Sequence, residues 1–191
     1  MKKALAFLMA AVMLMSMLTA CGNKDNAADN NDADNNNVNT EETDKAAADK
    51  VAALIDAIYV QERTEETDAQ CEAAKAAWDA LTDAQKALVE GEEASPDYFG
   101  LDTGDASKDD PRNQDEIGEK ELLVVSFGTS FNDSRVADIK SVEDALQEAN
   151  PDWSVRRAFT AQIIINHIQA RDGEKIDNMD QALERAVANG V

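Results

Sequence analysis

The sequence predicts an α/β fold with an open parallel sheet for its C-terminal part, preceded by a small all-α segment and a disordered tether. Three observations carry this prediction. Apolar runs alternate with amphipathic helical patterns after residue 120, apolar residues recur at helical spacing between residues 45 and 91, and the stretch before them is rich in Asn and Asp. Each pattern has a period or a composition typical of one class of structure.

The first residues have the layout of an export signal. A basic start, "MKK", precedes an apolar stretch over residues 4–18 that is short for a membrane-spanning helix. The following Leu18-Thr19-Ala20-Cys21 resembles a bacterial lipobox, in which Cys21 would become the lipidated first residue of the mature protein. An ordinary signal peptide with a chance cysteine is the alternative. We therefore expect a lipoprotein anchored to the outer face of the cytoplasmic membrane.

Charge and cysteine content limit the classes of partner. The formal net charge is −21, and so acidic a surface repels nucleic acid and anionic lipid headgroups. Membrane attachment would then depend on the lipid, and stable anchoring needs more than one acyl chain, as a lipobox cysteine carries. Besides Cys21 the chain has only Cys71, so no disulfide within the mature chain is expected. Cys71 falls in an apolar helical pattern, which favours a buried hydrophobe over a redox or metal role.

The stretch over residues 21–44 is too polar to fold by itself. Val38 is its only sizeable apolar residue, so burial cannot offset the conformational entropy that folding would remove. We expect a disordered tether here, between the lipid and the folded parts.

Residues 45–91 have the pattern of a small helical module. Apolar residues follow helical spacing twice, at Val51, Leu54, Ile55 and Ile58 and again at Cys71, Ala74, Trp78 and Leu81. Thr82 and Gln85 have the spacing of a capping box at the start of a third helix, which Gly91 should end. The block also resembles a helical module that recurs in surface proteins of Gram-positive bacteria, which implies a spacer or docking unit.

Residues 92–119 have the composition of an acidic linker. They hold two prolines and many acidic residues, which disfavour helix and compact packing. The run "DASKDD" lacks the glycine and the terminal glutamate of a calcium loop, so it predicts a solvated charge run and no metal site.

After residue 120 the pattern becomes strand, helix, strand, helix. Leu122–Val125 is an unbroken apolar run suited to a strand covered on both faces, and Trp153–Phe159 should form a second strand. A helix over about residues 134–148 should turn one apolar side inward, formed by Val136, Ile139, Val142 and Leu146. This alternation predicts an open parallel sheet.

Two further helices should end at Gly173 and Gly190. The second should face inward with Met179, Ala182, Leu183, Ala186 and Val187. The chain stops at Val191, where a third strand should begin, so we expect residues 120–191 to be the N-terminal part of a larger, truncated domain.

The loop after the first strand, Ser126-Phe127-Gly128-Thr129-Ser130, is the candidate binding site. It matches no P-loop, dinucleotide fingerprint or nucleophile elbow. Ligands in open α/β sheets bind at the carboxyl ends of strands, and a helix that begins near Ser134 would direct free N–H groups to the same place, which suits an anion. The alternative is that Gly128 only makes the turn and that Thr129 or Ser130 caps the helix.

Three segments resemble one family in order and spacing. "LLVVSFGTSFNDSR", "PDWSVRRAFTAQIII" and "ARDGEKIDNMDQALERAVANGV" are similar to the amino-terminal part of the anaerobic cobalt chelatases, the class II sirohydrochlorin cobaltochelatases of cobalamin biosynthesis. The resemblance implies two similar α/β halves with a cleft between them, in which sirohydrochlorin, a tetrapyrrole rich in carboxylates, receives cobalt (Co²⁺) as substrate without ATP or another nucleotide. It also implies a metal-chelatase lyase. A homo-oligomer is a separate expectation.

The resemblance places the catalytic groups elsewhere in the family's chain. Metal insertion needs ligands for the divalent ion and a base for the pyrrole protons, and the family's histidines and glutamate for this purpose fall beyond Val191. We therefore expect the 191-residue chain to hold no catalytic or metal-binding residue and to be inactive alone. His167 is expected to be a surface residue, because one imidazole without partners makes no metal site.

The residues of this chain that remain as candidates for substrate contact are those expected to line the wall of the implied cleft. Besides Ser126–Ser130, Arg157 (or its neighbour Arg156) is expected to bind a substrate carboxylate, because a guanidinium group binds carboxylate with two hydrogen bonds. Adjacent strand residues face opposite ways, so only one of the two arginines can do so. Phe159 is expected either to stack on a macrocycle or to pack in the core.

These expectations combine into one hypothesis and one rival. The leading hypothesis is an exported, lipid-anchored sirohydrochlorin cobaltochelatase. The rival is a tetrapyrrole- or metal-binding lipoprotein for capture or delivery without insertion, since sirohydrochlorin is made in the cytoplasm. A protein-docking role of the helical module is a third hypothesis. The expected segments are a signal peptide (1–20), a tether (21–44), a helical module (45–91), an acidic linker (92–119) and the chelatase-like part (120–191).

Overall fold

The structure is a computed structural model that describes the backbone of residues 32–191 and the side chains from residue 40 onward. The predicted signal peptide, Cys21 and the first part of the predicted tether lie outside the described residues. Among the helices that are described, none combines the length and the apolar character needed to cross a membrane. The helices are α1 (Asp32–Ile58), α2 (Thr67–Asp79), α3 (Asp83–Lys86), α4 (Asn132–Ser134), α5 (Ser141–Ala149), α6 (Gln162–Asp172) and α7 (Met179–Asn189).

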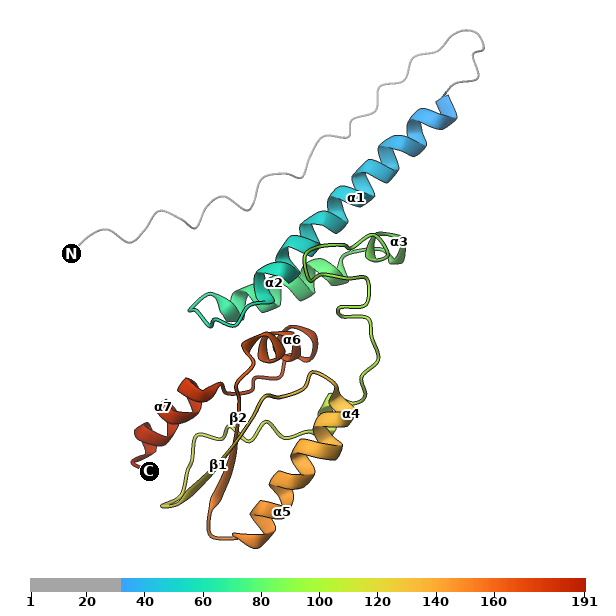
Figure 1. Ribbon diagram of the computed structural model, residues 1–191. Coiled ribbons are helices and arrows are strands. Elements are labelled where there is room, and N and C mark those ends of the chain that lie inside the picture. Colours follow the sequence, from blue (N-terminus) through green and yellow to red (C-terminus); the bar gives the residue numbers. More distant parts are fainter. Residues whose placement is uncertain (1–31) are drawn as a thin grey trace, which may run out of the picture.

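The two strands confirm the predicted parallel α/β arrangement. Strand β1 (Glu121–Ser126) pairs in parallel with β2 (Ser154–Phe159), in a register that sets Leu122 opposite Val155 and Ser126 opposite Phe159. The helical stretch α4–α5 connects β1 to β2 in the sequence. In Figure 1 it runs alongside the two strands, as the crossover of a β-α-β unit does. Both strands therefore end at the same edge of the sheet, and the loop Ser126–Ser130 lies at that edge.

The helix between the strands differs from its predicted phase. Between α4 and α5 the chain makes a π-helical segment, Arg135–Lys140, so that residues 132–149 form one helical stretch. A π-turn takes up extra residues and shifts the later side chains around the axis. As a result the fully buried residue of α5 is Glu143, while Val142, predicted to face inward, is 55% exposed.

Both predicted glycine stops are present in the last two helices. Gly173 and Gly190 follow α6 and α7 with φ of 72° and 76°, the left-handed conformation of helix C-caps. The predicted inward face of α7 is wrong for two of its residues, because Leu183 is 49% and Val187 is 76% exposed. Among the residues of α7 only Ala182 is fully buried, because the described sheet has two strands and covers little of the helix.

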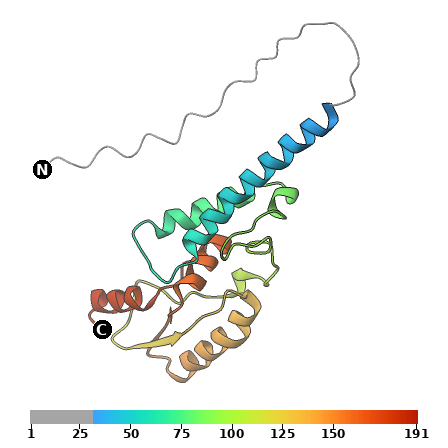
Figure 2. The ribbon, with the colours of Figure 1, turned by 45° about the horizontal axis from the view of Figure 1, so that its top comes forward.

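The helical module has its own small core, which extends onto the α/β part. Both predicted stripes are largely buried, and Thr82 and Gln85 form the predicted capping box of α3, although α3 ends at Lys86, before Gly91. The core cluster is formed by Ala48, Val51, Ala52, Ile55, Ile58, Cys71, Ala74, Trp78, Val89, Ala94, Tyr98, Phe99 and, from α6, Ala170. Figures 1 and 2 show α6 lying directly below α1 and α2, so the module packs on the chelatase-like part.

Two segment boundaries differ from the sequence prediction. Helix α1 begins at Asp32, so residues 32–44, expected as tether, are helical. Once a packed segment has nucleated a helix, each further residue adds one hydrogen bond at little cost, which allows such an extension. The segment 92–119 contains little helix, as predicted, but it is tightly packed: Tyr98 and Phe99 are buried in the module's core and the Asp109 side chain is fully buried.

Candidate ligand-binding loop and the charge network beneath it

The loop Ser126–Ser130 is held by hydrogen bonds to the end of the second strand. The Thr160 N–H donates to the Ser126 carbonyl at 2.9 Å, and the Ala161 N–H donates to the Phe127 carbonyl at 3.3 Å. The Phe127 side chain is 64% exposed. The loop therefore follows the sheet edge closely and presents an aromatic ring to solvent, which is suited to contact with a flat apolar ligand.

Gly128 is required at this turn for two independent reasons. Its φ is +93°, in a region that residues with a side chain rarely adopt. A Cβ atom at this position would also lie 2.4 Å from Cδ2 of Phe159. Phe159 was predicted either to stack on a ligand or to pack in the core. It is fully buried and packs in the core, next to Gly128 of the loop.

The helix after the loop has part of its N-terminus bonded to acceptors of the protein itself, which the sequence prediction did not include. Its first residue is Asn132, and the Asp133 N–H donates to the Thr103 carbonyl at 2.8 Å. The Asn132 amide group also donates to the Gly104 carbonyl at 3.1 Å. The segment predicted as a linker thus supplies acceptors to the start of this helix. No side chain caps the helix, although Thr129 Oγ1 accepts from the Phe131 N–H at 3.2 Å.

Two arginine side chains donate hydrogen bonds to backbone carbonyls in the second half of the loop. Arg135 donates to the Thr129 carbonyl at 3.3 Å, and Arg171 donates to the Ser130 carbonyl at 2.7 Å. Both guanidinium groups also donate to Oδ1 of Asn132, at 2.7 and 3.1 Å. The position of Thr129 and Ser130 is therefore set by charged hydrogen bonds, which are stronger than neutral ones.

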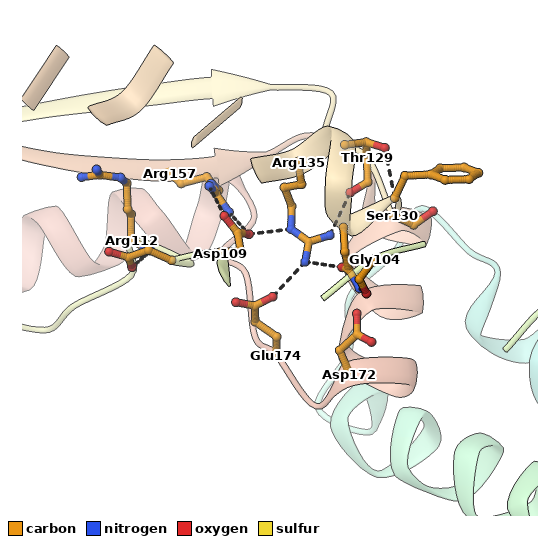
Figure 3. A network of polar contacts seen from close by, with 12 residues as sticks. Gly104, Asp109, Arg112, Thr129, Ser130, Arg135, Arg157, Asp172 and Glu174 are labelled. Carbon is orange, nitrogen blue, oxygen red and sulfur yellow. Dashed lines mark hydrogen bonds and ion pairs between the residues drawn. The ribbon is translucent and has the colours of Figure 1, made fainter. Parts of the chain in front are cut away.

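Arg135 belongs to a buried network of charged side chains, shown in Figure 3. The Asp109 carboxylate lies at its centre, 2.5 Å from Nε of Arg135 and 2.7 and 2.9 Å from the two terminal nitrogens of Arg157. Glu174 pairs with Arg135 at 3.0 Å, and Glu143 pairs with Arg157 at 2.7 Å. The network thereby joins the linker, the helix after β1, strand β2 and the loop before α7.

The pKa values follow from burial and pairing. Burial alone would raise the pKa of Asp109, but the hydrogen bonds from Arg157 and Arg135 outweigh it and hold the pKa below its ordinary value. Burial would lower the pKa of Arg157, yet its bonds to Glu143 and Asp109 raise it further. Burial raises the pKa of Glu174, which Arg135 only partly offsets. The centre of the network is therefore ionised at neutral pH.

Arg157 does not occupy the position expected for a substrate contact. Its side chain is fully buried, and two carboxylates already take its guanidinium group. Arg156 points the other way, as strand geometry predicts, and pairs with Glu121 at 3.1 Å and Asp177 at 2.9 Å. Both guanidinium groups are therefore paired with carboxylates of the protein itself.

A pocket of about 330 Å³ lies where the second strand ends. Its lining combines the end of β2, the starts of α6 and α7 and the loop between α1 and α2: Gln61, Glu62, Arg63, Phe159, Thr160, Gln162, Asn178, Met179 and Asp180. Gln162 is the first residue of α6, and its N–H donates to the side-chain oxygen of Gln61 at 2.7 Å. The helical module therefore contributes a wall to this pocket at the carboxyl end of β2.

His167, expected at the surface, is only partly exposed, and its Nε2 atom is buried. Its ring stacks on Tyr98, with 4.3 Å between the centroids, and it lies edge-on to Phe99. Burial, with the positive charge of Arg171 adding to it, lowers the pKa of His167 to about 4. The residue is neutral at physiological pH and holds α6 against the linker. Within the described part of the chain, no group of three or more His, Cys, Asp or Glu side chains could hold a metal ion.

Sequence reasoning missed Asp109, Arg135 and Arg171 as parts of the site. Asp109 lies in an acidic run that has no periodicity, and Arg135 has the appearance of an exposed residue at a helix start. The one available signal was the spacing of Arg135 just after the glycine loop, where an arginine can turn back to the loop's carbonyls.

The comparisons with known proteins agree with the resemblance of the C-terminal segment. Residues 120–191 match the family described as cobalt chelatase (CbiK). A sirohydrochlorin cobaltochelatase of Salmonella typhimurium is 44% identical over 72 residues, which are 38% of this chain and 27% of that protein. The chain thus spans about a quarter of the length of this relative. No solved structure matches the chain.

Proposed function

We propose, from the premise that residues 120–191 are a cobalt chelatase segment, that the protein acts on sirohydrochlorin and inserts cobalt into it, as the name of its relative indicates. The observation that carries the proposal is the identity of 44% over a segment that includes the whole loop Ser126–Ser130. This loop lies at the carboxyl edge of a parallel sheet, where α/β proteins bind ligands.

The residues of this chain would bind and orient the substrate. Phe127 is exposed and can lie against the macrocycle, while the partly exposed Thr129 and Ser130 supply polar groups beside the glycine turn. The Ser126 hydroxyl is buried and does not face solvent. Arg135 and Arg171 fix the loop's carbonyls, so the loop is ordered before a ligand arrives and little entropy is lost on binding. Arg157 would act on this loop only indirectly, because it pairs with Asp109, which in turn pairs with Arg135. The metal ligands and the base for the pyrrole protons would come from a part of the protein beyond residue 191, as the resemblance implies.

An absorbance titration tests the proposal. The full-length protein is titrated with sirohydrochlorin, and Co²⁺ is then added. We expect a spectral change on binding and a second change when the metal enters the macrocycle. The 191-residue chain is expected to show the first change at most. A full-length protein that causes no spectral change at all would refute the proposal.

A second function is favoured by the lipobox-like Leu18-Thr19-Ala20-Cys21. An exported protein would meet tetrapyrrole or metal outside the compartment in which sirohydrochlorin is made, so it would capture or deliver its ligand without inserting metal. The same titration separates the two functions, because a binding protein shows the first spectral change and lacks the second.

A further inference from the structure

We propose that Asp109, which lies outside the segment that matches the chelatase family, is a positioning residue for the loop Ser126–Ser130. It holds Arg135 in the orientation in which Arg135 fixes the Thr129 carbonyl. The ligand in this inference rests on the proposed function, whereas the ordering of the loop does not.

The geometry gives Asp109 a connecting role that no other carboxylate of the network has. Its side chain is fully buried and contacts both Arg135 and Arg157, at 2.5 and 2.7 Å. Glu143 contacts Arg157 but not Arg135, and Glu174 contacts Arg135 but not Arg157. Of these three carboxylates, only Asp109 bridges Arg157 of strand β2 and Arg135, the arginine that reaches the loop. It approaches Nε of Arg135, while the terminal nitrogens of Arg135 reach Thr129, Asn132 and Glu174.

Charge balance shows what the loss of Asp109 would do. The network contains three arginines (Arg112, Arg135 and Arg157) and three buried or nearly buried carboxylates (Asp109, Glu143 and Glu174), while a fourth carboxylate, the half-exposed Asp144, pairs with Arg112. Removing Asp109 leaves Arg135 with Glu174 and Arg157 with Glu143 as their carboxylate partners, and it takes away the negative charge between two buried guanidinium groups, which is costly in a low-dielectric interior. Arg135 would then be drawn toward Glu174, away from the position in which it reaches the Thr129 carbonyl.

The neighbouring backbone supports the same role for this segment. The Thr103 and Gly104 carbonyls accept from the Asp133 N–H and the Asn132 amide group, at 2.8 and 3.1 Å. Gly104 has φ +100°, and a Cβ atom there would lie 2.0 Å from Oδ1 of Asp133. Residues 103–109 are thus fitted against the junction between the loop and the helix at several points, with Asp109 as the charged one.

Hydrogen exchange in the 191-residue chain tests the ordering of the loop. In Asp109→Asn, which keeps the size of the side chain, amides of residues 126–135 should exchange at least about tenfold faster, the effect of losing one charged hydrogen bond. Amides of α2 and α6 should change much less. The matched control is Glu116→Gln, which removes an exposed carboxylate of the same segment and should change neither. Unchanged exchange in residues 126–135 would overturn the proposal.

A charge-balanced double variant separates positioning from mere stabilisation. Asp109→Asn combined with Arg135→Gln removes one charge of each sign, so the melting temperature should recover toward that of the wild type. The loop should still exchange about tenfold faster, because Arg135 no longer holds the Thr129 carbonyl. Recovery of loop protection together with stability would overturn the proposal. If Asp109→Asn alone does not fold, loop exchange in the double variant is compared with that in Arg135→Gln. Equal exchange in the two supports a role of Asp109 through Arg135, and clearly faster exchange in the double variant overturns it.

Sirohydrochlorin binding provides the second readout. Asp109→Asn and the double variant should both bind the tetrapyrrole about tenfold or more weakly than the wild type. If the wild-type protein does not bind sirohydrochlorin, the proposed function fails and the exchange data still decide the role of Asp109. If the wild type binds and both variants bind equally well, the inference fails and the proposed function stands.

Discussion

The rings of Tyr98 and His167 stack face to face, with 4.3 Å between their centroids and 11° between their planes. Tyr98 belongs to the segment predicted as a linker and His167 belongs to α6. Phe99 lies edge-on to both rings. This aromatic cluster of Tyr98, Phe99 and His167 joins the helical module, the linker and the chelatase-like part.

The stack predicts that the free energy of unfolding falls as the pH is lowered from about 6.5 to about 4. In this interval His167 takes up a proton in the unfolded chain but not in the folded one, so its contribution is present above pH 6.5 and is lost on the way to pH 4. The slope attributable to His167 is at most about 1.4 kcal/mol per pH unit.

Urea unfolding of the wild type and of His167→Phe, measured across this pH range, checks the prediction. The variant keeps an aromatic ring for Tyr98 but has no proton to bind, so its stability should depend less on pH. Glu174, whose pKa is raised by burial, contributes with the opposite sign in both proteins and cancels in the difference. Equal slopes for the two proteins would contradict the neutral state of the half-buried His167.

Gly128→Ala should destabilise the protein more than Gly173→Ala. Both glycines have positive φ, which costs a residue with a side chain about 1–2 kcal/mol. At Gly173 no atom lies within 4 Å of an added Cβ, whereas at Gly128 that Cβ would lie 2.4 Å from the Phe159 ring. Urea unfolding of both variants measures the difference. Equal losses of stability would mean that Phe159 moves aside without cost.

The sequence predicted those features that depend on local pattern. The strands, their parallel order and the caps at Gly173 and Gly190 follow from periodicity and from glycine, and the structure has them. The side chains that were placed wrongly depend on distant partners or on helix phase. Val142 is exposed because a π-turn shifts the helix, and Arg157 is buried because Asp109, far away in sequence, provides its charge partner.

Arg157→Ala should unfold the protein more readily, and its main effect should not be on the ligand. The change removes one partner from each of two fully buried carboxylates, Asp109 and Glu143, and breaking a buried pair in this way costs about 3–5 kcal/mol. The control is Lys140→Ala, which breaks a partly exposed pair with Asp144 and should cost about 0–1 kcal/mol. Thermal unfolding provides the comparison. A stable Arg157→Ala protein with weakened sirohydrochlorin binding would instead support the substrate contact predicted from the sequence.

Cys21→Ala should abolish lipid attachment if the lipobox-like sequence Leu18-Thr19-Ala20-Cys21 is processed as proposed. The thioether to the lipid forms on the cysteine sulfur, so alanine leaves the precursor unprocessed or the product in the soluble fraction. Membrane fractionation of expressing cells gives the result, with Cys71→Ala as control, because Cys71 is fully buried in α2. A Cys21→Ala protein that is cut and stays with the membrane as the wild type does would disprove the anchor.

The contacts of Asn166 predict that the helical module and the chelatase-like part unfold as one unit. Asn166 is fully buried in α6; it donates to the Ile58 carbonyl at 2.9 Å and accepts from the Gln162 amide group at 2.8 Å. The sequence alone predicts weak protection over residues 121–190, since the second strand lacks a further neighbour. The module covers α6 from the other side, which the sequence did not predict, and this cover should give the segment measurable protection.

Asn166→Ala tests this coupling. Loss of its two buried hydrogen bonds leaves the Ile58 carbonyl without its amide donor and should cost about 1–3 kcal/mol. The exposed Asn189 offers a control, because Asn189→Ala removes bonds that water can replace. Under urea, hydrogen exchange in α1, α2 and α6 should rise together in Asn166→Ala and should stay as in the wild type in Asn189→Ala. Faster exchange confined to α6, with α1 and α2 unchanged, would show that the module folds by itself and only rests against the chelatase-like part.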